Sequence, residues 1–331
     1  MITELSLYLN EGTNPYKNLA LEEYLLGCVR PGQCILYLWQ NRHTVVIGRN
    51  QNSFKECRIE ELERDGGFLA RRLSGGGAVF HDLGNLNFTF LVRKPDYDVN
   101  RQTEVILRAV QAFGIAASRT GRNDIAIEGR KFSGNAYYES GDFCYHHGTI
   151  LVDVNKNDMS RYLNVSKEKL QSKSVESVRS RVTNLSEYIP DITVELVKER
   201  MEQAFAEVYG LPVLRMERGE IDWGSVEEKE KKYSSWEWKY GRKIPFTHCL
   251  LRRFPWGEAE ITLEVNEGRI IQAVICSDAL DTVYLKALEQ ALPGTLYRLS
   301  DMERVLAETA ADTDLQREMR DDLAGLIREE L

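Results

Sequence analysis

The chain has 331 residues, of which 43% are hydrophobic and 28% are charged, and its formal net charge is −8. These proportions are typical of globular proteins and exclude a disordered or fibrous chain, and the length predicts about two domains of roughly 150 residues each. No apolar run approaches the ~18 residues of a membrane span, and the first residues lack the pattern of a secretory signal. The negative charge gives no general footprint for nucleic acid or an anionic membrane, so we expect a cytoplasmic enzyme that binds neither.

The cysteines are far apart in the sequence and form no Cys-x-x-Cys pair. This spacing excludes a zinc ribbon and indicates buried, reduced thiols. The six residues are Cys28, Cys34, Cys57, Cys144, Cys249 and Cys276.

Hydrophobic periodicity predicts many strands and few long helices in the first half of the chain. Strands are expected at 4–9, 34–39, 44–47, 68–73, 85–92, 124–128, 131–138 and 144–153, and helices at 18–29, 55–65 and 101–113. Turn-forming residues 139–142 join the last two strands. Strands that follow one another in this way favour an α+β fold with a mainly antiparallel sheet.

The second half begins with an amphipathic helix expected at 192–209, with Thr193 as its N-cap and Gly210 just past its end. Residues 215–235 are charge-dense and weakly periodic, which favours a bridging segment. Further on, a hairpin turns at Asn266–Glu267–Gly268, and helices are expected at 282–291 and 315–329. These elements predict a large domain over 1–247 and a small one over 248–331.

The most informative segment is RRLSGGGAVFHDLGN, residues 71–85. Adjacent glycines allow backbone N–H groups to approach and cradle an anion, and Arg71 and Arg72 supply charge and a planar fork for phosphate or carboxylate. The alternative is a flexible hairpin tip. Neither GxxxxGK[ST] nor GxGxxG after a strand is present, so P-loop and Rossmann sites lack their central feature.

A second segment, GRNDIAIEGRKFSGNAYY, covers residues 121–138 and places Lys131 at the start of a strand. A lysine there can bring its ammonium beside a phosphate or a polarised carbonyl, although most lysines are simply solvated. A third segment, residues 174–185, is a polar loop that either closes over an adenylate or is solvated.

Two adjacent histidines, His146 and His147, suggest a metal site. Neighbouring residues on a strand point to opposite faces, and no further ligand lies at zinc spacing, so structural zinc is improbable. Cys144 and His146 share a face, which leaves a Cys–His nucleophile open, but a buried core cysteine is the more economical interpretation.

Taken in this order, the motifs resemble the lipoate–protein ligases of the two-domain bacterial type. The matching strings are NLALEE (18–23), TVVIGRNQN (44–52), RRLSGGGAVFHDLGN (71–85), GRNDIAIEGRKFSGNAYY (121–138), HHGTILVD (146–153), SVRSRVTNL (177–185) and SSWEWKYG (234–241). The resemblance implies a catalytic domain with the fold shared by biotin ligases and class II aminoacyl-tRNA synthetases. It also implies a small α/β accessory C-terminal domain.

The resemblance further implies a reaction in two steps. Lipoate, or octanoate in its place, reacts with Mg-ATP to give the acyl-AMP and pyrophosphate. A lysine of an apo lipoyl domain of a 2-oxoacid dehydrogenase, or of glycine-cleavage H protein, then attacks the mixed anhydride. A carboxylate that attacks an α-phosphate brings negative charges together, which calls for Lys131, an arginine and Mg²⁺ as counter-charge.

Carried over position by position, the resemblance assigns the site residues. Lys131 is implied to be catalytic and to contact the α-phosphate and the lipoyl carbonyl oxygen, and we expect Asp124 to hold Mg²⁺ or to orient the incoming lysine. The implied ATP-binding residues are Arg72, Gly77, Ala78, Val79, Phe80, Asn123, Asp124, Lys131 and Arg181. The implied lipoate-binding residues are Arg72, Ser74, Gly75, Gly76, His81, Lys131, Gly134 and His147.

Other functions of related folds fit less well. Octanoyl- and lipoyl-transferases pass the acyl group through a cysteine thioester without ATP, but no cysteine lies between Cys57 and Cys144, and such transferases usually lack a small domain. A biotin ligase would carry a GRGRxGR-like loop, which is absent. A non-catalytic lipoate-binding module would be expected to lose Lys131 or the glycines, and both are present.

Overall fold

The computed structural model describes residues 1–121, 123–163, 182–240, 248–266 and 268–330. The chain folds as two compact units, which are described separately. The first comprises Met1–Val46, Lys55–Arg71 and Val79–Lys239. The second comprises Ile47–Phe54, Arg72–Ala78 and Tyr240–Leu331.

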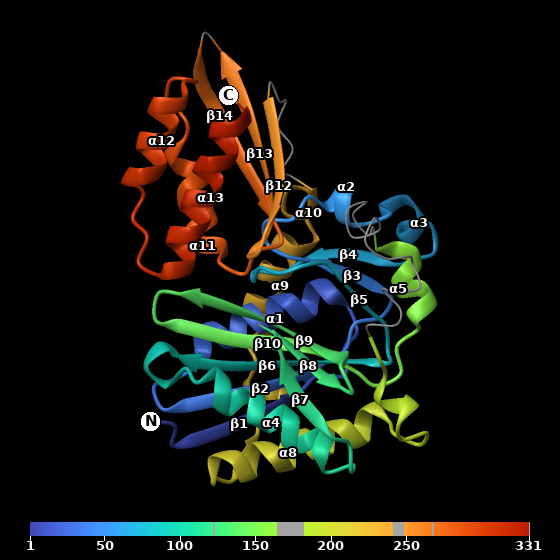
Figure 1. Ribbon diagram of the computed structural model, residues 1–331. Helices are drawn as coiled ribbons and strands as arrows, with labels where there is room; N and C mark the ends of the chain where they lie inside the picture. The colour runs from blue at the N-terminus through green and yellow to red at the C-terminus, as the bar shows by residue number, and fades with distance from the viewer. Residues whose placement is uncertain (122, 164–181, 241–247, 267, 331) are drawn as a thin grey trace. The chain divides into compact units, whose positions relative to one another are not determined.

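An eight-stranded sheet with the order β11-β1-β2-β6-β10-β9-β8-β7 forms the centre of the first unit (Figure 1). Strand β1 runs parallel to β11 and β2, and the other neighbouring pairs are antiparallel. The mainly antiparallel sheet predicted from the sequence is therefore confirmed. The strands are β1 (Glu4–Leu9), β2 (Gln33–Trp39), β6 (Asn85–Arg93), β7 (Ala117–Thr120), β8 (Asp124–Ile127), β9 (Arg130–Ser140), β10 (Phe143–Leu151) and β11 (Val213–Arg215).

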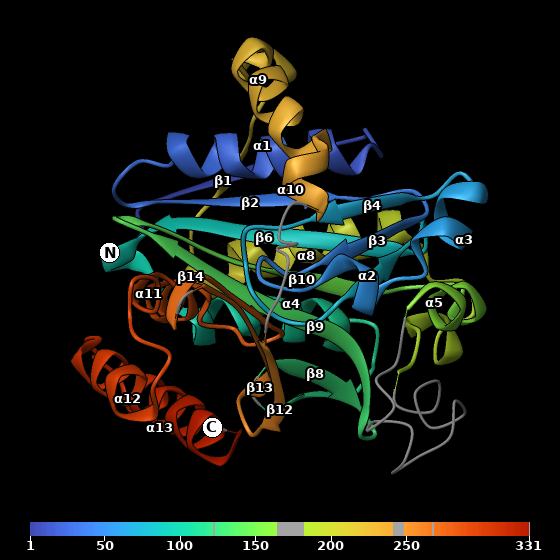
Figure 2. The same ribbon diagram turned by 90° about the horizontal axis from the view of Figure 1, so that it is seen from above.

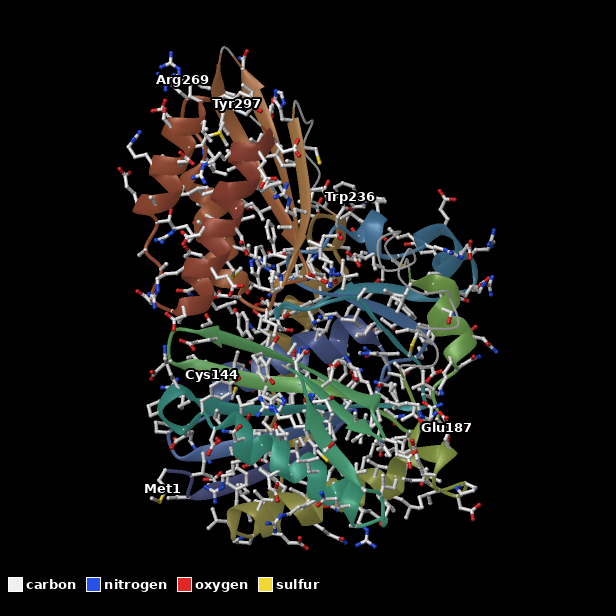
Figure 3. All side chains as sticks on the ribbon, viewed as in Figure 1. Met1, Cys144, Glu187, Trp236, Arg269 and Tyr297 are labelled. Carbon is white, nitrogen blue, oxygen red and sulfur yellow. The ribbon has the colours of Figure 1, made fainter. Side chains whose placement is uncertain are left out.

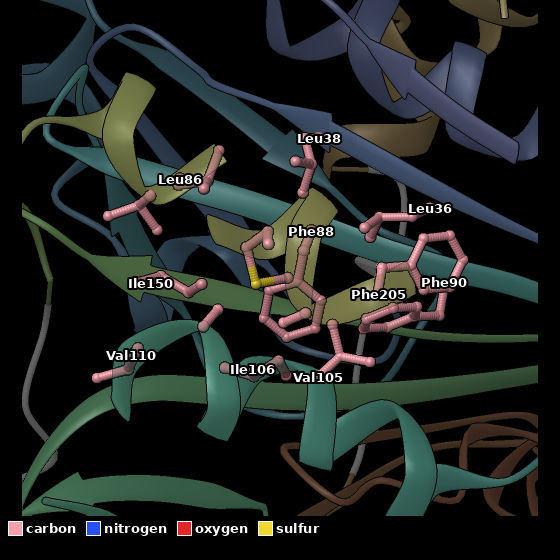
Figure 4. Close-up of a cluster of buried hydrophobic side chains, with 14 of the residues drawn as sticks. Leu36, Leu38, Leu86, Phe88, Phe90, Val105, Ile106, Val110, Ile150 and Phe205 are labelled. Atoms are coloured by element: carbon pink, nitrogen blue, oxygen red, sulfur yellow. The ribbon is translucent and has the colours of Figure 1, made fainter. Parts of the chain in front are cut away.

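Helices α4 (Val99–Gln111) and α8 (Val194–Tyr209) cover one face of this sheet and bury its main hydrophobic core (Figure 4). Phe90 of β6 packs against Phe205 of α8 in this core. Helix α8 has the predicted ends: Thr193 accepts a hydrogen bond from the backbone N–H of Leu196, and Gly210 adopts the left-handed conformation.

The opposite face of the sheet is covered by α1 (Pro15–Cys28), on which α9 (Trp223–Ser234) packs (Figure 2). Helix α1 begins earlier than predicted, because Asn14 caps it and Pro15 occupies its first position. The expectation of a bridging segment over 215–235 is wrong, since Asp222 caps the helix α9 there. The aromatic Tyr233 of α9 donates a hydrogen bond of 2.7 Å to Glu23 of α1, which fixes the charged helix to its neighbour.

A smaller sheet with the order β4-β3-β5 completes the first unit. The single helix predicted at 55–65 is wrong: two short helices replace it, because the backbone of Cys57 forms a β-bridge with Leu163 between them. The elements of this region are β3 (Thr44–Ile47), α2 (Ser53–Glu56), α3 (Ile59–Arg64), β4 (Phe68–Arg71), β5 (Val79–His81), α5 (Lys156–Tyr162) and α10 (Trp236–Tyr240). Of their residues, Ile47, Ser53, Phe54 and Tyr240 are counted in the second unit.

The second unit contains a three-stranded antiparallel sheet with helices on one face. The hairpin predicted around residues 266–268 is confirmed as β13 and β14. Alternate residues of β13 are buried against the helices, as in Ala259, Ile261 and Leu263. The elements are β12 (His248–Phe254), β13 (Gly257–Asn266), β14 (Arg269–Ser277), α11 (Thr282–Ala291), α12 (Leu299–Glu308) and α13 (Asp314–Glu330).

Among the helices of the described residues, none is long and apolar enough to cross a membrane.

Candidate functional site

The hairpin of β8 and β9 brings together four of the predicted site residues: Asn123, Asp124, Lys131 and Gly134. Asp124 lies opposite Gly134 in register, and a bulge on β9 lets Lys131 and Gly134 face the same side of the sheet. The Nζ atom of Lys131 lies 2.7 Å from Oδ1 of Asp124, and about a third of each side chain is exposed. The cation predicted to be catalytic is therefore held at a defined position by a carboxylate.

Gly134 leaves the space through which the lysine side chain reaches Asp124. A Cβ atom at this position would lie 2.8 Å from both Cε and Nζ of Lys131, closer than real Cβ contacts. The residue was predicted to bind lipoate, and the geometry adds that its missing side chain accommodates Lys131.

The backbone of Lys131 is fixed as well as its side chain. The N–H of Thr183 donates a hydrogen bond of 2.8 Å to the carbonyl of Lys131, and Lys131 forms a parallel bridge with Val182. Val182 and Thr183 belong to the polar segment 174–185. Arg181, predicted to bind ATP, lies outside the described residues, as do residues 174–180 of that segment.

The two adjacent histidines of β10 point to opposite faces of the sheet, as predicted. His147 Nδ1 lies 2.8 Å from Oε1 of Glu22 on α1, whereas His146 contacts Gln102 on α4. Burial disfavours the charged imidazolium and lowers the pKa of His146 to about 3, with smaller contributions from His147 and Arg119. His146 is therefore neutral at physiological pH.

A set of buried, hydrogen-bonded side chains, which we call the Glu22 cluster, lies between the two predicted histidines His81 and His147. It consists of Glu22, Thr89, Trp39 and His147. Glu22 contacts His147 and accepts a hydrogen bond of 2.7 Å from Thr89 Oγ1. Trp39 Nε1 donates to the same hydroxyl, and the ring of His81 packs edge-on against Trp39. Sequence reasoning did not single out Glu22, Trp39 or Thr89. The available signal was a carboxylate at a core position of the helical string NLALEE.

On β5, the predicted residues Phe80 and His81 are buried and Val79 is half-buried. The ring of Phe80 packs against His43 and Tyr162, so Phe80 belongs to the local aromatic core. Nδ1 of His81 lies 3.2 Å from the Asn41 amide nitrogen, so Nδ1 is the acceptor and the ring proton is on Nε2.

The predicted glycine loop, Arg72–Ala78, belongs to the second unit, and the side chain of Arg72 stabilises it by hydrogen bonds to other residues of the loop. The guanidinium of Arg72 donates hydrogen bonds to Ser74 Oγ at 3.1 Å, to the carbonyl of Gly75 at 2.7 Å and to the carbonyl of Gly77 at 2.8 Å. The loop ends at the half-buried Ala78. Arg72 thus sets the shape of the loop, in addition to the ligand-binding role predicted for it.

Two of the three glycines of this loop, Gly75 and Gly76, are required for different reasons. A Cβ atom on Gly75 would lie 2.3 Å from the carbonyl oxygen of Ala279, and Gly76 has a φ of +86° and donates its N–H to that same oxygen at 3.2 Å. A Cβ atom on Gly77 would meet nothing within 4 Å. Close backbone packing therefore explains Gly75, and backbone conformation explains Gly76.

The neighbouring arginine, Arg71, lies in the first unit and caps the end of α10. Its guanidinium donates hydrogen bonds of 2.8 Å to the carbonyls of Trp238 and Lys239, and Trp238 Nε1 donates back to the carbonyl of Arg71. The side chain is buried. This reciprocal pairing accounts for Arg71 without a ligand.

Cys144 (labelled in Figure 3) faces the hydrophobic core of the first unit. Burial raises the pKa of its thiol to about 11, so it is not a ready thiolate nucleophile. Within the described residues, no group of three or more His, Cys, Asp or Glu side chains is arranged to hold a metal ion.

Comparison with known proteins places this geometry in a family. The model of the lipoyl protein ligase A/B catalytic domain matches residues 14–206, and that of the bacterial lipoate protein ligase C-terminus matches residues 243–327. The chain is similar to the P. falciparum protein LipL1, solved in complex with lipoate, at 28% identity and a TM-score of 0.84, over 97% of this chain and 99% of that one.

Two further structures are similar over a smaller part of this chain. A bi-partite lipoate protein ligase from Thermoplasma acidophilum, described together with its E2 lipoyl domain, is 28% identical with a TM-score of 0.65, over 74% of this chain and 100% of that one. A lipoate-protein ligase A bound with ATP is 26% identical with a TM-score of 0.63, over 73% of this chain and 99% of that one. Because the catalytic-domain model alone matches more than half of the residues, the chain belongs to the lipoate-protein ligase family.

Proposed function

We propose that this protein activates lipoate with ATP and transfers the lipoyl group to a lysine of an apo lipoyl domain or of glycine-cleavage H protein. Similar proteins are described with lipoate, with ATP, and with an E2 lipoyl domain, which supports the substrates and the acceptor class. In the first step a carboxylate oxygen bonds to the α-phosphorus and pyrophosphate leaves. In the second step the lysine amine bonds to the acyl carbon and AMP leaves.

The observation that carries this proposal is the fixed position of Lys131. Both steps develop negative charge on oxygen, at the α-phosphate and then at the acyl carbonyl, and a preorganised cation stabilises such charge. The 2.7 Å contact with Asp124, the open space over Gly134 and the backbone bond from Thr183 hold the ammonium without a ligand. Lys131 is therefore proposed as the catalytic residue, and Asn123 and Asp124 as its neighbours at the adenylate.

The lipoyl group is proposed to lie on the face of the sheet that carries Gly134 and His147. The Glu22 cluster fixes the imidazole of His147 there through buried hydrogen bonds, and His81 contacts the same cluster through Trp39. The glycine loop braced by Arg72 is proposed to contact ATP and lipoate.

Mg²⁺ is proposed to arrive with ATP and to be coordinated mainly by its phosphates, as is usual for this ion. Asp124 is the acidic side chain that pairs with Lys131, and we propose it as the one protein ligand. The catalytic part is proposed to comprise 1–247, with 248–331 as an accessory domain.

Pyrophosphate release, measured with ATP and lipoate and with or without an apo lipoyl domain, tests this function. Pyrophosphate that depends on lipoate, followed by a gain of one lipoyl mass on the acceptor lysine, is the expected result. Acyl transfer without ATP, with a thioester trapped on a cysteine, would instead identify a transferase.

A further inference from the structure

A row of hydrogen-bonded side chains, which we call the His146 row, runs through the sheet on the face opposite His147. It consists of Gln102 of α4, His146 of β10, Asn135 of β9 and Asn123 before β8. His146 lies 3.2 Å from Gln102 Oε1 through Nδ1 and 2.8 Å from Asn135 Oδ1 through Nε2. Gln102 and His146 are completely buried, and Asn135 is 6% exposed.

The protonation of this row follows from its hydrogen bonds. Asn135 Nδ2 donates to the carbonyl of Asn123 at 3.0 Å, so Asn135 Oδ1 must accept from the ring of His146. The neutral imidazole has one proton, which is therefore on Nε2. Its Nδ1 is left as an acceptor, and a Gln102 amide with Nε2 turned toward the ring satisfies it.

The row ends on the backbone of the site. The carbonyl of Asn123 accepts hydrogen bonds from the backbone N–H of Asn135 at 2.9 Å and from its Nδ2 at 3.0 Å, and Asn123 Nδ2 donates back to the carbonyl of Asn135 at 2.9 Å. The next residue, Asp124, carries the carboxylate that contacts the amine of Lys131. A displacement of the Asn123 backbone would therefore also move Asp124 and the Lys131 amine that contacts it.

Packing alone does not explain a histidine at this position. The imidazole lies among the rings of Phe88, Phe90 and Tyr137. A phenylalanine would fill similar space without burying two polar nitrogens, and buried polar groups cost stability unless each is satisfied. We therefore expect the hydrogen bonds of His146 to contribute more to the positions of its partners, Gln102 and Asn135, than to the stability of the core.

We infer that His146 is a positioning residue for lipoate activation: from the opposite face of the sheet it fixes Asn135 and the Asn123–Asp124 backbone, and thereby the Lys131 amine. This inference rests on the proposed function. It assigns a role to a side chain that touches neither substrate nor the reacting atoms.

The test uses the full chain under single-turnover conditions, so that slow variants remain measurable. In His146→Phe we expect the rate of lipoyl-AMP formation to fall about ten-fold while the KM values for lipoate and ATP change less than about two-fold. His146→Gln should recover most of the rate, because an amide N–H can donate to Asn135. Tyr137→Phe is the matched control, since it keeps the ring beside His146 and should retain the parent rate.

A double-mutant cycle with Asp124→Asn separates positioning from a general structural effect. If His146 acts through Asp124, adding His146→Phe to Asp124→Asn should cost less than about two-fold. Additive losses, or a parent-like rate in folded His146→Phe, would overturn the inference. Should His146→Phe fail to fold, Gln102→Met removes only the Nδ1 partner, and an unchanged rate in that variant would also overturn it.

A second readout does not depend on the proposed function. Hydrogen exchange of the Asn135 backbone N–H should be faster in His146→Phe than in the parent, and unchanged exchange would contradict the inference. Absence of lipoate-dependent pyrophosphate from the parent chain would instead refute the proposed function, so the two failures are distinguishable.

Discussion

Replacing Gly134 by alanine should lower the catalytic rate while leaving the fold intact. The new Cβ would lie 2.8 Å from Cε and Nζ of Lys131, and ordinary contacts begin at 3.4 Å. The amine must therefore move by about 0.6 Å, away from its position beside Asp124. Misplacement by about 1 Å can cost on the order of 100-fold in rate, so we expect a loss of about ten-fold or more in kcat.

The stability of the same variant should change little. The clashing atoms belong to the far end of a flexible side chain, and alanine is favoured over glycine in a strand by about 0.5–1 kcal/mol. We expect the free energy of unfolding to stay within about 1 kcal/mol of the parent.

Lipoate-dependent pyrophosphate release and urea unfolding, measured on the same preparation, test both parts. Gly27→Ala is the matched control, because a Cβ there meets nothing within 4 Å and lies on α1. Parent-like kcat in Gly134→Ala, or a loss that only follows the fraction of unfolded protein, would refute the steric argument.

Four further outcomes are expected. Lys131→Ala should lower the rate of ligation about 10²–10³-fold in a protein of normal melting temperature, and near-normal ligation would contradict its catalytic role. Cys144→Ser should still ligate lipoate, whereas an acyl adduct trapped on Cys144 in the parent would favour a thioester transferase. Gly75→Ala should lower the free energy of unfolding by about 1–3 kcal/mol, because its Cβ meets backbone atoms, whereas Gly77→Ala should not. Equal melting temperatures of these two variants in thermal unfolding would exclude the close packing at Ala279. His146 has a pKa of about 3 in the folded chain, so on acidification the unfolded chain binds the proton first, and the contribution of His146 to stability should be complete above about pH 6.5. Between about pH 6.5 and pH 3 the free energy of unfolding should fall by up to about 1.4 kcal/mol per pH unit. Denaturant unfolding of His146→Phe should lack this slope, and parallel pH profiles of variant and parent would contradict the low pKa.

The strands and the longer helices could be predicted because their signals are local. Alternation over 144–153 and the capped pattern over 192–209 each correspond to an element of the structure, β10 and α8. The helix α9 was missed because its face against α1 is held by charged and aromatic side chains, such as Lys232 and Tyr233, which give weak apolar periodicity. Likewise, the helix predicted at 55–65 is interrupted at Cys57 by a β-bridge to Leu163, a residue too distant in the chain for a local sequence pattern to indicate.

The site could be predicted as a set of residues but not as a set of contacts. The motif around Lys131 named the lysine, Asp124 and Gly134, and strand alternation correctly separated His146 from His147. Sequence patterns do not show that Lys131 crosses Gly134, because this depends on a bulge in β9. Nor do they connect Glu22 with His147, since the pairing joins residues far apart in the chain through tertiary packing.

The second unit is assembled from segments far apart in the sequence, and this has a consequence for the order of folding during synthesis. Its glycine loop, Arg72–Ala78, belongs with residues near the opposite end of the chain, and the carbonyl that Gly76 contacts is that of Ala279. At a synthesis rate of about 5–20 residues per second, the loop is made roughly 10–40 s before that partner. By the end of this interval the nascent chain holds the strands around Lys131, but until Ala279 is made its glycine loop lacks this backbone acceptor. We therefore expect the glycine loop to reach its folded conformation, and any ligand binding that depends on it to begin, only after Ala279 has been made.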